Sequence, residues 1–190
     1  TYPNTVADNL ILYATGTNVV GTNSGFSFDE TTLTIPGQIA FPATQSASAG
    51  ANTLDDYEEG TWTPSIGGST SESGQVYTTQ VGRYIKIGKL VHIQGRVTLS
   101  TLGTITGTVQ IEGLPFTPDS TSNNFSSGSM FYWSGMTTNF VTFGFYIFPG
   151  SAVLNVTALT AANTAIGTVV QADLSNISDW GFQCCYQASA

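Results

Sequence analysis

The chain has 190 residues, of which only 8% are charged, and twelve acidic residues against four basic ones give a formal net charge of −8. This charge argues against nucleic-acid binding, because phosphate binding needs clustered Lys and Arg. Polar positions are mostly Thr, Ser, Gly and Asn, which favour pleated sheets joined by short turns. No apolar run approaches the roughly 20 residues of a membrane-spanning helix, so membrane insertion is not expected.

Residues 1–50 carry short apolar pairs such as Leu10 and Leu12, separated by Gly, Thr and Asn. Each piece is too short to bury a core alone. The segment is therefore expected to be either a flexible linker or one strand of a thin, intertwined fibre stem whose core is shared between chains. A Pro, Ala and Ser stretch, FPATQSASAGANT, follows as a connector. The start at Thr1, not Met, is typical of a processed product or an excised C-terminal piece.

The stretch LDDYEEGTWTP concentrates four carboxylates within residues 55–59. One interpretation is a structural junction, in which the acids cap backbone amides or pair with Arg83 and Arg96 of the same or a neighbouring chain. In this interpretation Tyr57 and Trp62 anchor the junction. The other is a calcium site, since hard cations take clustered carboxylates, but the spacing lacks the alternating ligands and turn Gly of a calcium loop. We therefore favour the junction and predict no metal and no cofactor. The junction residues are Asp55, Asp56, Tyr57, Glu58, Glu59 and Trp62.

From residue 61 onward, apolar residues recur with a period of two. In KLVHIQGRVTLS, residues 91, 93, 97 and 99 share an apolar face, while residues 92, 94, 96 and 98 share a polar one. The preceding YTTQVGRYIKI joins this strand through Gly88 and Lys89, which suit a two-residue hairpin turn. Further strands are expected within 106–113, 128–133, 139–148, 152–159, 168–171 and 180–187. Residues 51–190 are therefore predicted to form an all-β, antiparallel, jelly-roll-like β-sandwich.

All four basic residues, Arg83, Lys86, Lys89 and Arg96, fall within one fourteen-residue stretch. One interpretation is that they are solvated strand positions that keep an edge from pairing with other chains. The alternative is a small patch for an anionic sugar or lipopolysaccharide.

The strand NFVTFGFYIF is apolar on both faces. Leaving one face wet would forgo about 1.5–3 kcal/mol for each exposed Phe. Either a loop of the same chain or a neighbouring subunit must cover it, and the subunit is favoured. The side chains expected at this oligomer interface are Phe143, Phe145 and Ile147.

Two adjacent cysteines lie in the predicted strand WGFQCCYQ. Neighbouring strand residues point to opposite faces, so a bond between the two would be strained. Cys184 falls on the apolar face and is predicted to be a buried thiol, whereas Cys185 falls on the polar face.

The sequence contains no recognisable catalytic set. Glycoside hydrolysis needs two carboxyls at a defined separation, and the acids outside the junction are isolated along the chain. There is no G-x-S-x-G motif, and the single His92 has no obvious Asp and Ser context. We therefore predict that the protein is not an enzyme.

Three stretches carry a resemblance to a known family. These are FPATQSASAGANTLDDYEEGTWTP, YTTQVGRYIKIGKLVHIQGRVTLS and VQIEGLPF, which lie within residues 41–116. They resemble the C-terminal receptor-binding region of bacteriophage tail fibres and related phage or prophage fibre proteins. The resemblance implies a homotrimer on the virion with a β-rich tip and a fibrous stem. It also implies attachment to an upstream fibre, tail or baseplate protein and adhesion to a host surface glycan or protein.

On this interpretation, residues 1–50 form the stem and connector and residues 51–190 the tip. Three weak sites on one rigid trimer gain affinity through avidity. The candidate binding residues are Tyr132, Trp133, Asn123, Asn124, His92 and Arg96. The competing interpretation is that Tyr132, Trp133 and their neighbour Phe131 belong to the core or an interface. The alternative functions are a head fibre or capsid decoration protein and a tailspike-like polysaccharide depolymerase.

Overall fold

The structure is a computed structural model, in which side chains are described from residue 31 onward. The described residues are 11–16, 19–23, 27–28, 31–42, 50, 53–54, 56–161 and 165–189. The chain divides into two compact units, Thr1–Pro42 and Ala43–Ala190. The division falls inside the Pro, Ala and Ser connector.

The first unit contains two short antiparallel strand pairs. Strand β1 (Ile11–Gly16) pairs with β2 (Val19–Asn23), and β3 (Ser27–Phe28) pairs with β4 (Leu33–Thr34). None of the side chains of residues 31–42 is buried. This part of the unit therefore forms no core of its own within one chain.

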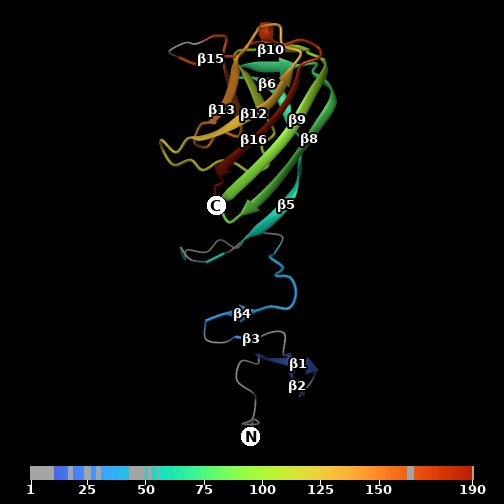
Figure 1. The fold of residues 1–190 in the computed structure, drawn as a ribbon, viewed down its shortest axis with the longest axis vertical. Helices are drawn as coiled ribbons and strands as arrows, with labels where there is room; N and C mark the ends of the chain where they lie inside the picture. Colours follow the sequence, from blue (N-terminus) through green and yellow to red (C-terminus); the bar gives the residue numbers. More distant parts are fainter. Residues whose placement is uncertain are drawn as a thin grey trace. The chain divides into compact units, whose positions relative to one another are not determined.

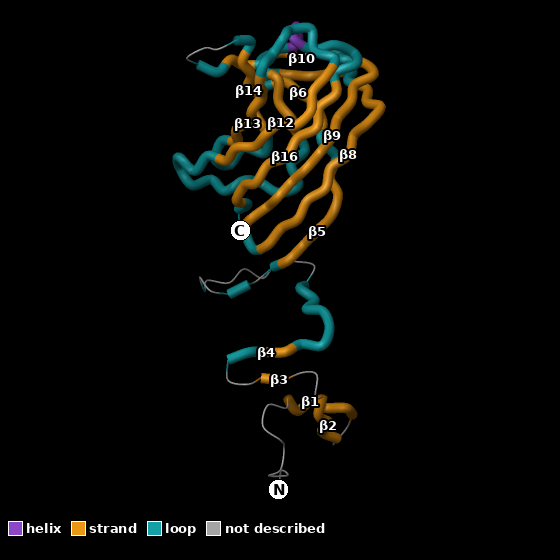
Figure 2. Tube along the Cα trace, in the orientation of Figure 1, coloured by secondary structure: helices purple, strands orange, loops and turns teal. Residues whose placement is uncertain are grey.

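The second unit is built around one ten-stranded sheet (Figures 1 and 2). Its elements are β5 (Tyr57–Trp62), β6 (Ser65–Gly68), β7 (Ser71–Ser73), β8 (Val76–Ile87), β9 (Leu90–Thr101), β10 (Thr104–Thr106), β11 (Val109–Glu112), β12 (Ser126–Ser134), β13 (Thr142–Ile147), β14 (Leu154–Leu159), β15 (Gly167–Thr168), the 3-10 turn η1 (Gln171–Asp173) and β16 (Asp179–Gln187). The strand order is β5-β8-β9-β16-β12-β13-β14-β11-β6, with β15 beside β14, while β7 and β10 form a separate pair. All pairs are antiparallel, which confirms the predicted all-β fold.

The sheet curls because its two end strands are neighbours in sequence. Only Thr63 and Pro64 separate β5 from β6, although these strands stand at opposite ends of the strand order. The Tyr77 hydroxyl of β8 accepts a hydrogen bond from the Ile66 amide of β6 at 2.8 Å. This contact links β6, at one end of the strand order, to β8, which stands next to β5 at the other end.

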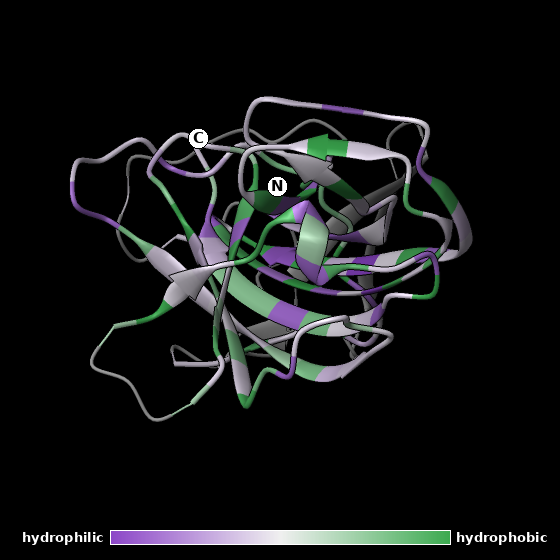
Figure 3. Ribbon diagram, turned by 90° about the horizontal axis from the view of Figure 1, so that it is seen from above, coloured by the Kyte–Doolittle hydropathy of each residue, from purple (hydrophilic) through white to green (hydrophobic). Residues whose placement is uncertain are grey.

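The predicted hairpin between β8 and β9 is confirmed, including its turn at Gly88 and Lys89. Gly88 has a φ of 55°, a conformation that costs glycine little. Ile87 pairs with Leu90, and the register then runs without a shift as far as Thr79 and Thr98. The apolar face of β9 is buried as expected, and Figure 3 shows hydrophobic and hydrophilic segments following one another along the strands.

The interior of the curled sheet holds the core. Its largest fully buried side chains are Ile66, Val91, Ile93, Val97, Leu99, Val109, Ile111, Ile147, Leu154, Trp180, Phe182 and Tyr186. They come from strands far apart in sequence, so burial of this core depends on closing the whole sheet.

The structure corrects the expected role of one face of β13. Phe143, Phe145 and Ile147 are 7%, 3% and 1% exposed and belong to the core of a single chain. The curl of the sheet brings Trp180 and Phe182 of β16 against them, at ring-centroid distances of 6.5 Å from Phe143 and 5.8 Å from Phe145. These side chains therefore offer no surface to a partner.

A loop partly covers the other face of this stretch. Phe148 contacts Phe125 of the loop before β12, at a ring-centroid distance of 5.3 Å, and also contacts Tyr146 at 5.0 Å. Phe125 and Phe148 remain 53% and 45% exposed. Of the two possible covers, the loop of the same chain is thus present but incomplete.

Candidate ligand-binding face

Five neighbouring strands, β5, β8, β9, β16 and β12, present a continuous side away from the core, which we call the outer face. Positions two apart along a strand share a side, so the register sets side chains opposite one another in rows across this face. One such row, which we call the polar row, is exposed in all its members. It consists of Thr61, Arg83, Gln94, Gln183 and Ser129.

Three hollows adjoin one another on the outer face. A hollow of about 410 Å³ lies over β5, β8 and β9. A second, of about 240 Å³, shares Arg83 and Gln94 with it and includes Phe131, which is 65% exposed. A third, of about 270 Å³, lies over β9, β12 and β16 and shares His92 with the first. Concave surfaces with a few polar groups and an aromatic ring are typical of ligand sites.

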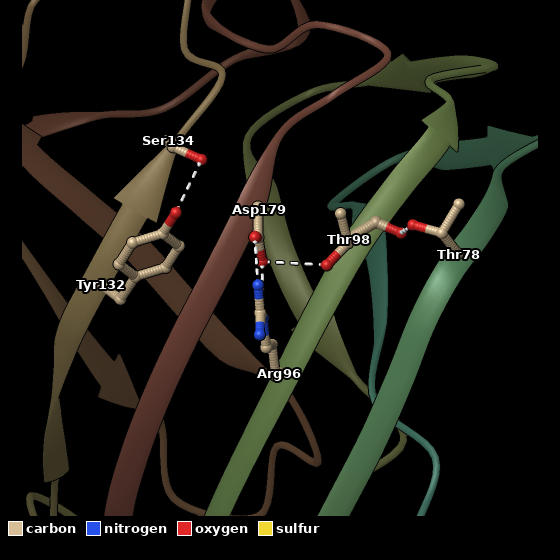
Figure 4. A network of polar contacts seen from close by, with 6 residues as sticks. All are labelled: Thr78, Arg96, Thr98, Tyr132, Ser134 and Asp179. Carbon is tan, nitrogen blue, oxygen red and sulfur yellow. Dashed lines mark hydrogen bonds and ion pairs between the residues drawn. The ribbon is translucent and has the colours of Figure 1, made fainter.

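Two of the predicted binding residues, Arg96 and Tyr132, meet on this face (Figure 4). Arg96 donates from Nε to Asp179 Oδ1 at 3.0 Å and from its terminal nitrogen to Oδ2 at 2.6 Å. The Arg96 guanidinium carbon lies 5.7 Å from the centre of the Tyr132 ring. The Tyr132 hydroxyl donates to Ser134 at 3.3 Å. Arg96 therefore links β9 to β16 and β12.

The ion pair between Arg96 and Asp179 fixes the charge of both groups. Hydrogen bonds from Arg96 and then from Thr98, at 2.9 Å, hold the pKa of Asp179 below its ordinary value. The carboxylate in turn raises the pKa of Arg96. Because both oxygens of Asp179 accept from Arg96, this guanidinium is already engaged within the chain.

His92, also predicted as a binding residue, contacts Cys185 on the outer face. His92 Nδ1 lies 3.2 Å from Cys185 Sγ, since the two residues are paired in register across β9 and β16. Cys185 is exposed and Cys184 is buried, as strand alternation predicted. Burial raises the pKa of the Cys184 thiol to about 12, and this thiol donates to the Ser127 carbonyl at 3.3 Å.

The remaining predicted binding residues lie elsewhere. Trp133 turns toward the core and contacts Phe143 at a ring-centroid distance of 5.1 Å. Asn123 and Asn124 are exposed in the loop before β12, beyond the strand end opposite to Tyr132. The six residues therefore do not form one site, and the outer face unites only three of them.

The acidic junction is a folded part of the second unit. Asp56 and Lys86, 4% and 3% exposed, form a buried ion pair, and Lys86 Nζ lies 5.4 Å from the centre of the Phe116 ring. Glu58 accepts a hydrogen bond from Tyr84, which raises the pKa of Tyr84 to about 12. These partners replace Arg83 and Arg96, the ones expected from sequence.

The other junction residues divide between core and surface. Glu59 accepts from the Tyr57 hydroxyl at 3.0 Å, and Tyr57 is 45% exposed. Trp62 is 7% exposed and contacts Phe182 at 6.1 Å, so Trp62 is the aromatic anchor and Tyr57 is not. Asp55 lies outside the described residues. In the described part of the chain, no three metal-binding side chains gather.

One pair of acids lies closer together than the sequence indicated. Burial, and then the nearby Glu72 carboxylate, raises the pKa of Glu112. Glu72 itself accepts from the Gly68 amide at 3.3 Å. Glu72 lies on β7 and Glu112 on β11, and their carboxyl groups lie beside Gly68 and Gly67 of β6.

Sequence reasoning did not single out Gln94 and Gln183 as members of a site, and it left Arg83 as one of several cations. The hairpin register alone implies that Arg83 faces Gln94, because Ile87 faces Leu90 across the predicted turn. The position of Gln183 depends on the pairing of β9 with β16, which no local sequence pattern predicts.

Comparisons with known proteins returned no match. No family model matches the chain, and searches among curated proteins and among solved structures found no similar protein. Within the described residues, no helix has the length and apolar character needed to cross a membrane. The outer face and the sequence motifs therefore carry the functional argument.

Proposed function

We propose that the chain is the distal, receptor-binding part of a bacteriophage tail fibre, which attaches the virion to a glycan on the host surface. The sequence motifs within residues 41–116 motivate this proposal. An all-β unit with a long exposed sheet face fits an adhesion role, since such a face can carry varied side chains without disturbing the core. The role requires no cofactor and no catalysis.

The observation that carries the proposal is the set of three adjoining hollows on the outer face. Their borders carry amide, hydroxyl, imidazole, guanidinium and carboxylate groups, which can exchange hydrogen bonds with sugar hydroxyls. Gln94 and Gln183 are exposed and face each other across β9 and β16. The exposed Phe131 ring adds an apolar surface against which a sugar ring can stack.

The proposal includes a homotrimer with a thin stem and a sandwich-like tip. Its support in the first unit is the absence of any buried side chain within residues 31–42. Short strands that bury nothing gain stability when other copies complete their core. A trimer would also multiply weak single-site binding through a high effective concentration.

The test is binding of labelled full-length protein to bacterial cells and to their purified capsular and lipopolysaccharide glycans. A Gln94→Ala/Gln183→Ala variant should lose at least tenfold in apparent affinity, because both side chains line the hollows. Gln187→Ala is the matched control, since Gln187 is exposed on the same strand as Gln183 and lines none of these hollows. Equal binding by all three proteins would remove the outer face from the proposal.

Two alternatives are separated by further readouts. Localisation of the protein to phage heads instead of tails would identify a head fibre or capsid decoration protein. Release of reducing sugar from a bound glycan would identify a depolymerase, and Glu72 and Glu112 are the acids to substitute first in that case, because the fold brings them close together.

A further inference from the structure

The four cations of the chain differ in how far the fold already engages them. Lys86 is buried against Asp56, and Arg96 gives two hydrogen bonds to Asp179. Lys89 is exposed in the turn between β8 and β9 and borders none of the three hollows. Arg83 is exposed, borders two hollows, and makes no ion pair with any described residue.

The surroundings of Arg83 suit a carboxylate from outside the chain. Its neighbours in the polar row are Thr61 and Gln94, which are uncharged. Glu59 of β5 lines the larger hollow together with Arg83. It pairs in register with Ile85, accepts a hydrogen bond from the Tyr57 hydroxyl at 3.0 Å, and makes no ion pair with Arg83. Asp179 is already neutralised by Arg96. A planar guanidinium can hold a carboxylate with two parallel hydrogen bonds.

The polar row also sets a shape for the ligand. It crosses five strands, and strands lie about 4.8 Å apart, so the row spans about 19 Å. Its members follow one another at roughly the repeat of a pyranose ring. A linear polysaccharide lying across the strands can therefore meet one polar side chain per sugar.

We propose that the outer face binds a linear polysaccharide that carries carboxylates, such as a uronic-acid chain, and that Arg83 holds one carboxylate at the junction of the two hollows. This inference rests on the proposed glycan-binding function and specifies the class of glycan. An acidic chain with a net charge of −8 repels anionic polymers. The unpaired guanidinium therefore decides whether such a ligand binds.

The test is isothermal titration calorimetry of the full chain with oligogalacturonates and oligomannuronates, each beside its methyl ester. The ester keeps the sugar backbone and removes the charge. We expect the free acids to bind at least tenfold more tightly than their esters. Arg83→Gln should abolish this difference, and Arg83→Lys should retain part of it, because an ammonium keeps the charge but loses the bidentate geometry.

Lys89→Gln is the matched control, since it removes the same charge from an exposed position on the same hairpin. Equal losses in the two Gln variants would overturn the proposal in favour of a general charge effect. Binding of acid and ester alike, unchanged in Arg83→Gln, would overturn it while leaving a neutral glycan site intact. If no member of the panel binds, the inference fails, and the cell-binding assay decides the broader function separately. Circular dichroism of each variant is the control for folding.

Discussion

The two adjacent cysteines show how strand alternation separates neighbouring residues chemically. Cys184 lies among core side chains, and burial raises the pKa of its thiol to about 12. Cys185 lies on the outer face beside His92. Only a thiolate reacts readily with thiol reagents. The Cys184 thiol is therefore protected both because the reagent cannot reach it and because it stays protonated.

We therefore expect one thiol per native chain to react with an aromatic disulfide reagent at slightly alkaline pH. Cys185→Ser should abolish the reaction until denaturant is added, whereas Cys184→Ser should leave it intact. The measurement is the absorbance of the released thiolate. Cys184→Ser should also lower the free energy of unfolding equally with and without reductant, because it places a hydroxyl in the core. Two reactive thiols in the native protein would contradict this assignment.

Because of the ion pair between Arg96 and Asp179, the stability of the fold is expected to decrease at low pH. The pKa of Asp179 is lower in the folded chain than its ordinary value of 3.8. Its contribution is therefore present above pH 3.8 and is lost as the pH falls through the folded-state pKa. Asp179→Asn should lower the melting temperature at pH 7, and the difference from wild type should shrink toward pH 3 in calorimetric scans. A constant difference across this range would show that the loss is not electrostatic.

The raised pKa of Glu112 predicts the opposite dependence of stability on pH. Its pKa is raised above the ordinary value of 4.5 by burial and by Glu72, so its ionisation costs stability as the pH rises through the folded-state pKa. Glu112→Gln should therefore raise the melting temperature at pH 7 and leave it unchanged at pH 3.5. The effect is modest, because the carboxyl is partly solvated. Glu72→Gln should give a smaller gain at pH 7, since it removes only the neighbouring charge.

At the scale of single elements, local patterns identified strands better than they identified partners. The β8–β9 hairpin was predictable because Gly88 marks the turn and alternation then fixes both faces. The pairing of β9 with β16 was not, since it joins residues about 90 positions apart through hydrogen bonds that any extended strand can make. The same limit explains β13, where sequence showed two apolar faces but not that one of them lines the chain's own core.

A substitution within β13 tests this correction. Phe145→Ala should cost about 3–5 kcal/mol, because it opens a cavity in the core of one chain. Urea unfolding followed by tryptophan fluorescence measures the loss. Phe148→Ala is the control, since Phe148 is 45% exposed and its removal should cost far less. If the Phe145→Ala variant instead gave folded but dissociated subunits, Phe145 would lie at a subunit interface and the correction would be wrong.

At the scale of the whole molecule, the two units differ in how much they bury within one chain. The second unit closes its own core, so it needs no second copy to bury Phe143, Phe145 or Ile147. The described side chains of the first unit, residues 31–42, bury nothing within one chain. Any trimer is therefore expected to depend on the first unit, and on exposed rings such as Phe125 and Phe148, instead of on β13.

Light scattering of the full chain tests this expectation. We expect a molar mass of about three times 20.0 kDa, independent of protein concentration across the working range. Because the core of the second unit closes within one chain, Phe125→Ser/Phe148→Ser should leave that unit folded by circular dichroism, and any fall in mass would then report the contribution of these rings to association. A mass of one chain for the unmodified protein would refute the trimer. Glycan binding would then have to reach its full strength at a single outer face, without avidity.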